Sequence, residues 1–188
     1  MSVRGSDAIV VGRFVGTVDF DPGPGEVKFT SGGGTDGTDV CVSKFNTDGE
    51  FQWVLVWGNE HDALGRGAAI DQDGNVYVSA EFQGTVDFDP DPGGSEFRSS
   101  NGYRDLSLSK FDSYGNFIWV RTFGGSGHDR PGLVDVDKYG NPYMVAYFRG
   151  TNVNFAPSYP PCDNSPETRT ASGECDSVIV KHLAGGCW

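Results

Sequence analysis

The chain has 188 residues, 37% of them hydrophobic, and is long and apolar enough to bury a core. Its 14 Lys and Arg residues against 26 Asp and Glu give a net charge of -12, which repels phosphate backbones and anionic membrane surfaces. No stretch approaches the ~20 apolar residues of a membrane span. We therefore expect no nucleic-acid partner and no membrane insertion.

The first predicted strand runs from Asp7 to Phe14, and the segment that follows it is repeated along the chain. Gly16 to Pro22, with the sequence Gly-Thr-Val-Asp-Phe-Asp-Pro, recurs letter for letter as Gly84 to Pro90, 68 residues later. A weaker third copy runs from Gly150 to Pro157 and lacks both aspartates. Periods of this length are typical of stacked or radial repeats.

Two further blocks repeat in the same order. Ser43 to Val54 returns as Ser109 to Val120, 66 residues later, and a partial third copy begins at Lys181. The block from Ile70 to Val78 matches Val136 to Met144. Three blocks in a fixed order indicate about three copies of one unit some 66 to 68 residues long.

The second unit gives the clearest order of elements, because its apolar residues alternate with the period of two that strands require. The predicted elements, in chain order, are strand A near Gly67 to Asp71, a turn at Gln72 to Gly74, strand B from Asn75 to Phe82, a long excursion from Gly84 to Arg104, strand C from Asp105 to Phe111, a turn at Ser113 to Gly115, and strand D from Asn116 to Phe123. Four antiparallel strands joined by hairpin turns make one blade of a β-propeller.

These blocks resemble the SBBP-type β-propeller repeat of secreted and surface bacterial proteins. The D-x-x-G-N-[VI]-Y-V hairpin of that family corresponds to Asp71 to Val78, its K-[FL]-[DN]-x-x-G-N-x-x-W segment to Lys110 to Trp119, and its blade linker to Gly124 to Asp129. The resemblance implies a β-propeller at an extracellular or cell-surface location, although Met1 to Asp7 lacks the apolar core of a signal peptide. It implies little about a ligand, because propellers host unrelated functions.

We expect an all-β, β-propeller-like domain of about three four-stranded antiparallel blades, the first and last incomplete. The single repeat domain, 1–188, divides into blade 1 at 7–66 without strand A, blade 2 at 67–131, and blade 3 at 132–188 with a truncated strand D. Closed propellers use ~4 to 8 blades, so three blades cannot close a ring alone. A homodimer that completes a six-blade ring is the expected assembly. Further blades of a longer protein, or an open stack, are the alternatives that stay open.

The repeated Asp-Phe-Asp-Pro motif is the leading candidate for a binding site. Alternate residues of a strand project to one face, so the motif places carboxylates side by side, where a calcium ion with ~6 to 8 oxygen ligands would bridge them. The alternative is that each carboxylate accepts backbone amides in a tight turn. The third unit has Asn154 and Ala156 instead and would have lost the site. The candidate calcium ligands are Asp19, Asp21, Asp87, Asp89 and Asp91.

Two other patterns have both a structural and a chemical interpretation. Asp71 to Asn75 looks like the start of an EF-hand loop, but the required downstream glutamate is missing, which favours a hairpin turn. His61-Asp62 recurs as His128-Asp129, 67 residues later, in the predicted linkers between blades. Such pairs could act as general bases or metal ligands. A feature present in each linker is more typical of architecture.

Three tryptophans fall in predicted D strands. Trp53 and Trp119 occupy equivalent positions and are expected to pack between blades. Trp57 has Phe123 as its counterpart, so exposure as a sugar-stacking platform is an additional hypothesis for Trp57.

The four cysteines, Cys41, Cys162, Cys175 and Cys187, show no CxxC spacing. Cys162 and Cys175 lie in one loop rich in Pro, Ser and Asn, and a disulfide between them is expected if the protein is exported. The pairing of Cys41 and Cys187 stays open.

Three functions follow in order of preference. The first is a non-catalytic extracellular or cell-surface module that acts as a scaffold or interaction domain, because no acid, base and nucleophile set stands out. The second is a calcium-dependent carbohydrate-binding module. The third is a carboxylate-based hydrolase or lyase, which would need a carboxyl of raised pKa in a closed funnel. No residue is assigned a catalytic role.

Overall fold

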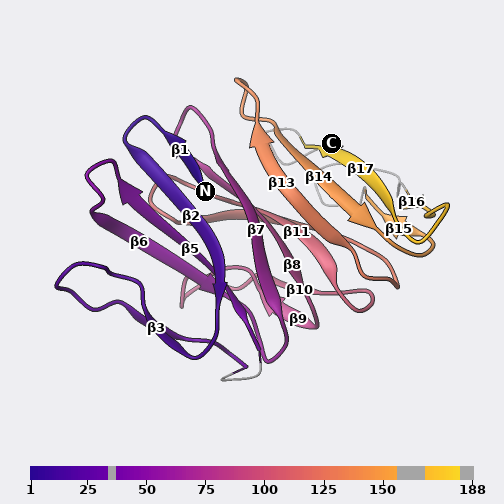
Figure 1. Cartoon of the computed structure of the whole chain (residues 1–188), viewed down its shortest axis with the longest axis horizontal. Helices are drawn as coiled ribbons and strands as arrows, with labels where there is room; N and C mark the ends of the chain where they lie inside the picture. The colour runs from indigo at the N-terminus through magenta and orange to yellow at the C-terminus, as the bar shows by residue number, and fades with distance from the viewer. Residues whose placement is uncertain (34–36, 156–167, 183–188) are drawn as a thin grey trace.

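The computed structural model describes residues 1–33, 37–155 and 168–182, and its regular structure consists of antiparallel β-sheets (Figure 1). The first four-stranded sheet pairs its strands in the order β1 (Ser2–Arg4), β2 (Asp7–Phe14), β5 (Asp39–Asn46) and β6 (Phe51–Trp57). The second follows the order β7 (Ala63–Ile70), β8 (Val76–Phe82), β11 (Asp105–Phe111) and β12 (Phe117–Phe123). The third sheet, as far as it is described, contains β13 (Arg130–Val136), β14 (Pro142–Phe148) and β17 (Asp176–Lys181).

A short hairpin lies between the second and third strands of each sheet. The three hairpins pair β3 (Thr17–Asp19) with β4 (Lys28–Thr30), β9 (Thr85–Asp87) with β10 (Phe97–Ser99), and β15 (Val153–Asn154) with β16 (Thr168–Arg169). The sequence predicted an excursion here without strands. The repeated Gly-Thr-Val-Asp segment instead forms the first strand of each of the first two hairpins. No helix in the described part of the chain is long and apolar enough to cross a membrane.

The strand order confirms the all-β, propeller-like fold class, with no closed ring among the described residues. Strands B, C and D predicted for the second unit agree with β8, β11 and β12 to within one residue. The differences concern strand A. The predicted boundaries at 66/67 and 131/132 fall inside β7 and β13. In the first sheet β1 pairs with β2, where no strand A was predicted, because three residues are too few to show a period of two.

Three hairpin turns in the second and third sheets are each held by an aspartate side chain. In the turn between β7 and β8, Oδ1 of Asp71 accepts the amide of Asn75 at 2.9 Å. Gly74 in this turn has a φ of 83°, in the left-handed region that glycine occupies without steric penalty. Asp112 and Asp137 accept the equivalent amides in two later turns, at 2.9 and 3.0 Å. The Asp-x-x-Gly-Asn pattern is therefore a turn here, as favoured over an EF-hand loop.

The first and second sheets pack face to face through an apolar core. Ile9, Val42 and Trp57 of the first sheet join Val78 and Phe111 of the second in this core. The ring centroids of Trp57 and Phe111 lie 5.4 Å apart. We call this contact the first junction.

The second and third sheets form a second junction of the same kind. Tyr77 and Leu108 of the second sheet join Met144 and Phe148 of the third in a common core. The second sheet is thus covered on both faces, and every residue of β8 and β11 is buried. In Figure 1 the second sheet accordingly lies between the first and the third.

The tryptophans lie at these junctions. Nε1 of Trp53 donates to the carbonyl of Ser113 across the first junction at 3.3 Å, and Trp119 is buried in the second junction. Their predicted packing between blades is confirmed. Trp57 is also buried, at 3% exposure, so the hypothesis that it forms an exposed sugar-stacking platform is wrong. Its position in the blade face made it part of the core.

We predict that Gly49→Ala lowers the free energy of unfolding by about 1–2 kcal/mol. Gly49 has a φ of 81°, and no atom lies within 4 Å of an added Cβ, so the cost comes from backbone conformation alone. Asp48→Ala in the same exposed turn is the matched control and should change stability by less than about 0.5 kcal/mol. Chemical denaturation measures both variants. An unchanged stability in the Gly49 variant would contradict the assigned turn.

Candidate functional site

The predicted calcium ligands lie at the end of the first strand and in the loop of each of the first two short hairpins, where their carboxylates accept backbone amides. Oδ1 of Asp19 accepts the amide of Val27 at 2.9 Å, and Oδ1 of Asp87 accepts that of Glu96 at 2.7 Å. The hydrogen bond from Val27 is the main cause that lowers the pKa of Asp19. The carboxylates of Asp21, Asp89 and Asp91 each accept the amide two residues further on, at 2.8, 3.1 and 2.9 Å.

These hydrogen bonds are the ones expected if the aspartates stabilise tight turns. Within the described residues, no group of three or more His, Cys, Asp or Glu side chains is arranged to hold a metal ion. Calcium binding at these aspartates stays a prediction.

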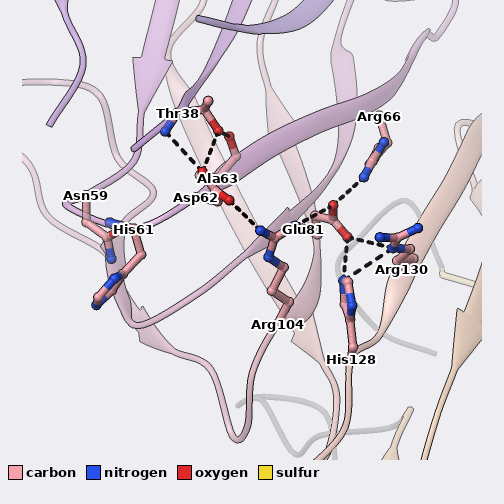
Figure 2. Close-up of polar contacts among 10 residues, drawn as sticks. All are labelled: Thr38, Asn59, His61, Asp62, Ala63, Arg66, Glu81, Arg104, His128 and Arg130. Atoms are coloured by element: carbon pink, nitrogen blue, oxygen red, sulfur yellow. Dashed lines mark hydrogen bonds and ion pairs between the residues drawn. The ribbon is translucent and has the colours of Figure 1, made fainter. Parts of the chain in front are cut away.

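The two His-Asp pairs have different surroundings. His61 is exposed and lies apart from the contacts drawn around Glu81 in Figure 2. Asp62 accepts the amide and the hydroxyl of Thr38, at 3.3 and 3.2 Å, and Asp129 accepts two backbone amides at 3.0 Å each. Both aspartates therefore tie linkers to neighbouring loops, as the architectural interpretation expects. His128, in contrast, belongs to a charged cluster.

That cluster, which we call the Glu81 network, surrounds one carboxylate of the second sheet (Figure 2). Glu81 on β8 is fully buried, and its Oε1 pairs with Arg66 of β7 and with Nη1 of Arg104, the latter at 3.4 Å. Its Oε2 lies 3.4 Å from Nε2 of His128 and 3.8 Å from Nε of Arg130. A buried carboxylate is strongly unfavourable unless it is paired, so the three arginines are what allow Glu81 to be buried.

The Glu81 network holds more positive than negative charge. Arg104 lies between two carboxylates, because it pairs with Asp62 as well as with Glu81. Arg66 and Arg130 have no acidic partner other than Glu81 among the described residues. The single negative charge of Glu81 therefore cannot neutralise the positive charges of both Arg66 and Arg130.

His128 accepts a hydrogen bond in this network through Nε2. Burial is the largest cause that lowers its pKa, and Arg130 lowers it further against the opposing effect of Glu81. Nε of Arg130 lies 3.3 Å from Nε2 of His128 and donates to it, which requires that Nε2 carries no proton. The imidazole thus acts as an acceptor that orients a guanidinium.

A pocket of about 370 Å³ opens beside the Glu81 network, between the second and third sheets. Arg66, His128 and Arg130 of the network line it, and Arg149, which follows β14, adds a further cation. The described residues offer no ion-pair partner for the Arg149 guanidinium. Pro131 and the half-exposed ring of Tyr147 also line the pocket.

The carboxyl whose pKa is raised to about 7 lies away from this pocket. Burial is the main cause of that pKa at Asp105, and the charge of Asp129 adds to it. Asp105 is fully buried at the start of β11, and its Oδ2 accepts the amide of Asn101 at 2.9 Å. A hydrolase or lyase needs such a group in contact with its substrate, so Asp105 gives that hypothesis no support.

The outer faces of the first and third sheets are a second candidate surface. Val10 on β2 is 42% exposed, whereas Val145 on β14 and Ile179 on β17 are 39% and 70% exposed. Val145 and Ile179 are direct cross-strand partners. Apolar side chains therefore face solvent at both ends of the described array of sheets.

The predicted disulfide between Cys162 and Cys175 cannot be placed, because residue 162 lies outside the described residues, as does Cys187. Within the described part of the chain Cys41 and Cys175 are free, and Cys175 is exposed. The bond stays a prediction.

No protein-family model matches this chain, and no curated protein matches it either. The motifs shared with the SBBP-type repeat therefore stay a resemblance, and the function has to be argued from geometry.

We predict that Glu81→Gln lowers the free energy of unfolding by about 3 kcal/mol, because it leaves several cations beside an uncharged buried group. Glu60→Gln is the matched control, since the Glu60 side chain is 81% exposed and lies 3.9 Å from Nε2 of His61. That variant should stay within about 0.5 kcal/mol of the parent. Equal stability of the two variants in urea denaturation would show that the Glu81 network is not what stabilises this edge.

We predict that Asp87→Ala costs about 2 kcal/mol, because Oδ1 of Asp87 accepts two backbone amides, those of Asp89 and Glu96. Asp87→Asn keeps an acceptor oxygen and should cost less than half as much. The calcium interpretation predicts instead that both variants lose a metal-dependent rise in melting temperature. Thermal melts with millimolar calcium and with chelator separate the two interpretations.

Proposed function

We propose that this chain is a non-catalytic interaction module whose terminal blades associate with those of a second copy. The observation that carries the proposal is a correspondence between faces. Each outer sheet face is the repeat counterpart of a face that is buried at a junction inside the chain. The extracellular or cell-surface location that the motif resemblance implies belongs to the same proposal.

The outer face of the first sheet corresponds to the face that the second sheet buries at the first junction. Phe14 ends β2 as Phe82 ends β8, and each pairs with the aspartate that opens the next strand of its sheet. Counting back along both strands, Val10 corresponds to Val78. Val78 is fully buried in the first junction, whereas Val10 is exposed.

The outer face of the third sheet corresponds in the same way to the face that the second sheet buries at the second junction. Asp176 opens β17 and pairs with Phe148 as Asp105 opens β11 and pairs with the end of β8. Ile179 therefore corresponds to Leu108, which is fully buried in the second junction.

A second copy offers a partner for each of these two faces. Exposed apolar area costs ~25 cal/mol per Å², and the same kinds of face already bury one another twice inside the chain. Two chains related by a two-fold axis can place the third sheet of each against the first sheet of the other. The expected assembly is a homodimer with six blades.

We predict that Ile179→Asp weakens self-association at least tenfold, because it places a charge in the centre of the new junction. Tyr114→Asp is the matched control, since Tyr114 is 81% exposed but lies in the turn between β11 and β12. Sedimentation velocity over a range of micromolar concentrations measures both. Circular dichroism checks that each variant is folded.

A parent chain that stays monomeric at high-micromolar concentration would overturn the proposal. The proposal would also be overturned if Ile179→Asp and Tyr114→Asp weakened self-association equally, because the effect would then not depend on the outer face.

A further inference from the structure

We propose that the pocket beside the Glu81 network binds an acidic sugar of the hexuronate class, with the carboxylate held by arginines. The residues that line the pocket come from β7 of the second sheet and from the third sheet with its flanking loops. Tyr147 lies on the same face of β14 as Val145, next to the face proposed to meet a second copy. The pocket does not include the aspartate motifs predicted to bind calcium.

The charge of the pocket selects an anion. Three arginines, Arg66, Arg130 and Arg149, line the pocket, and Glu81 is the one carboxylate that pairs with any of them among the described residues. This local excess of positive charge occurs in a chain whose net charge is -12. An acidic chain gains no general affinity for anions, so a concentrated cationic pocket is a specific feature of this place.

Several N–H donors of the guanidinium groups in the pocket have no hydrogen-bond partner among the described residues. Each guanidinium carries five N–H donors in a planar fork that matches a carboxylate. Oε1 of Glu81 engages Nη2 of Arg66, and the Nε of Arg130 donates to His128. The terminal nitrogens of Arg130 and the whole guanidinium of exposed Arg149 are left for a ligand. Because Glu81 and His128 fix Arg66 and Arg130 beforehand, a ligand would meet the donors of these two arginines in an ordered arrangement.

The rest of the lining selects a sugar among anions. About 370 Å³ lies in the range of small-molecule pockets, ~300–1,000 Å³, and a bare inorganic anion would leave most of it unfilled. An aromatic acid would offer the remaining N–H donors no oxygen besides those of its carboxylate. A hexuronate offers hydroxyl oxygens to those donors and a flat C–H face to the rings of Tyr147 and Pro131.

Isothermal titration calorimetry at low ionic strength tests the proposal with three probes: sodium glucuronate, glucose and inorganic phosphate. We expect saturable binding of glucuronate, affinity for phosphate at least tenfold weaker, and no binding of glucose. Arg149→Gln and Arg130→Gln should each weaken glucuronate binding at least tenfold. Arg149 makes no side-chain ion pair among the described residues, so its variant is expected to fold as the parent does, which a thermal melt verifies.

Arg13→Gln is the matched control for charge. Arg13 is exposed on β2, at the position that corresponds to Glu81 in the repeat, and does not line the pocket. Its loss should leave glucuronate binding unchanged. The proposal is overturned by the absence of saturable glucuronate binding, by equal binding of glucose, by phosphate binding as tight as that of glucuronate, or by an Arg13 variant that weakens binding as much as the Arg149 variant.

Discussion

The packing of one apolar sheet face against the next is the interaction on which the rest of this structure depends. A single sheet of this size has two faces, and an isolated sheet would leave both in water. The second sheet solves this by lying between two neighbours, so that all of β8 and β11 is buried. The first and third sheets have one such neighbour each within the described chain. Self-association, as proposed, extends the same packing to the two remaining faces.

The Glu81 network is a consequence of that packing at the edge of the sheets. Because both faces of β8 are covered, the charged residue near its end cannot turn toward solvent, and its carboxylate has to be paired where it lies. The partners come from the linkers and strand ends that meet at the same edge, including Arg104 before β11 and His128 before β13. Because one buried anion is paired with several cations, the network has a net positive charge. This net positive charge is the reason why the ligand proposed for the adjacent pocket is an anion.

Much of the fold could be predicted from the sequence, because the same short sequence motifs recur at nearly constant spacing. Alternating residues located β8, β11 and β12, and the Asp-x-x-Gly-Asn pattern located the turns. β1 was missed because three residues show no period. The β9 and β10 hairpin was missed because the strands within its loop are equally short.

The candidate site was much harder to predict. Asp62, Glu81 and Arg104 are scattered along the chain and come together through strand pairing within the second sheet, whereas Arg130 joins them at the second junction. The one local signal was Glu81 itself, a charged side chain near the end of strand B in the predicted middle blade. For Trp57 the sequence suggested a binding role that the structure does not support. Its aromatic side chain was considered for ligand binding but is buried between the first two sheets.

Small-angle X-ray scattering of the purified chain tests most directly the claim that complementary blade faces meet between copies. At high-micromolar concentration we expect the scattering mass of two chains and the pair-distance distribution of one compact, closed particle. The mass of a single chain at that concentration would contradict it. An elongated two-chain particle would contradict it as well, because only one of the two expected junctions would then have formed.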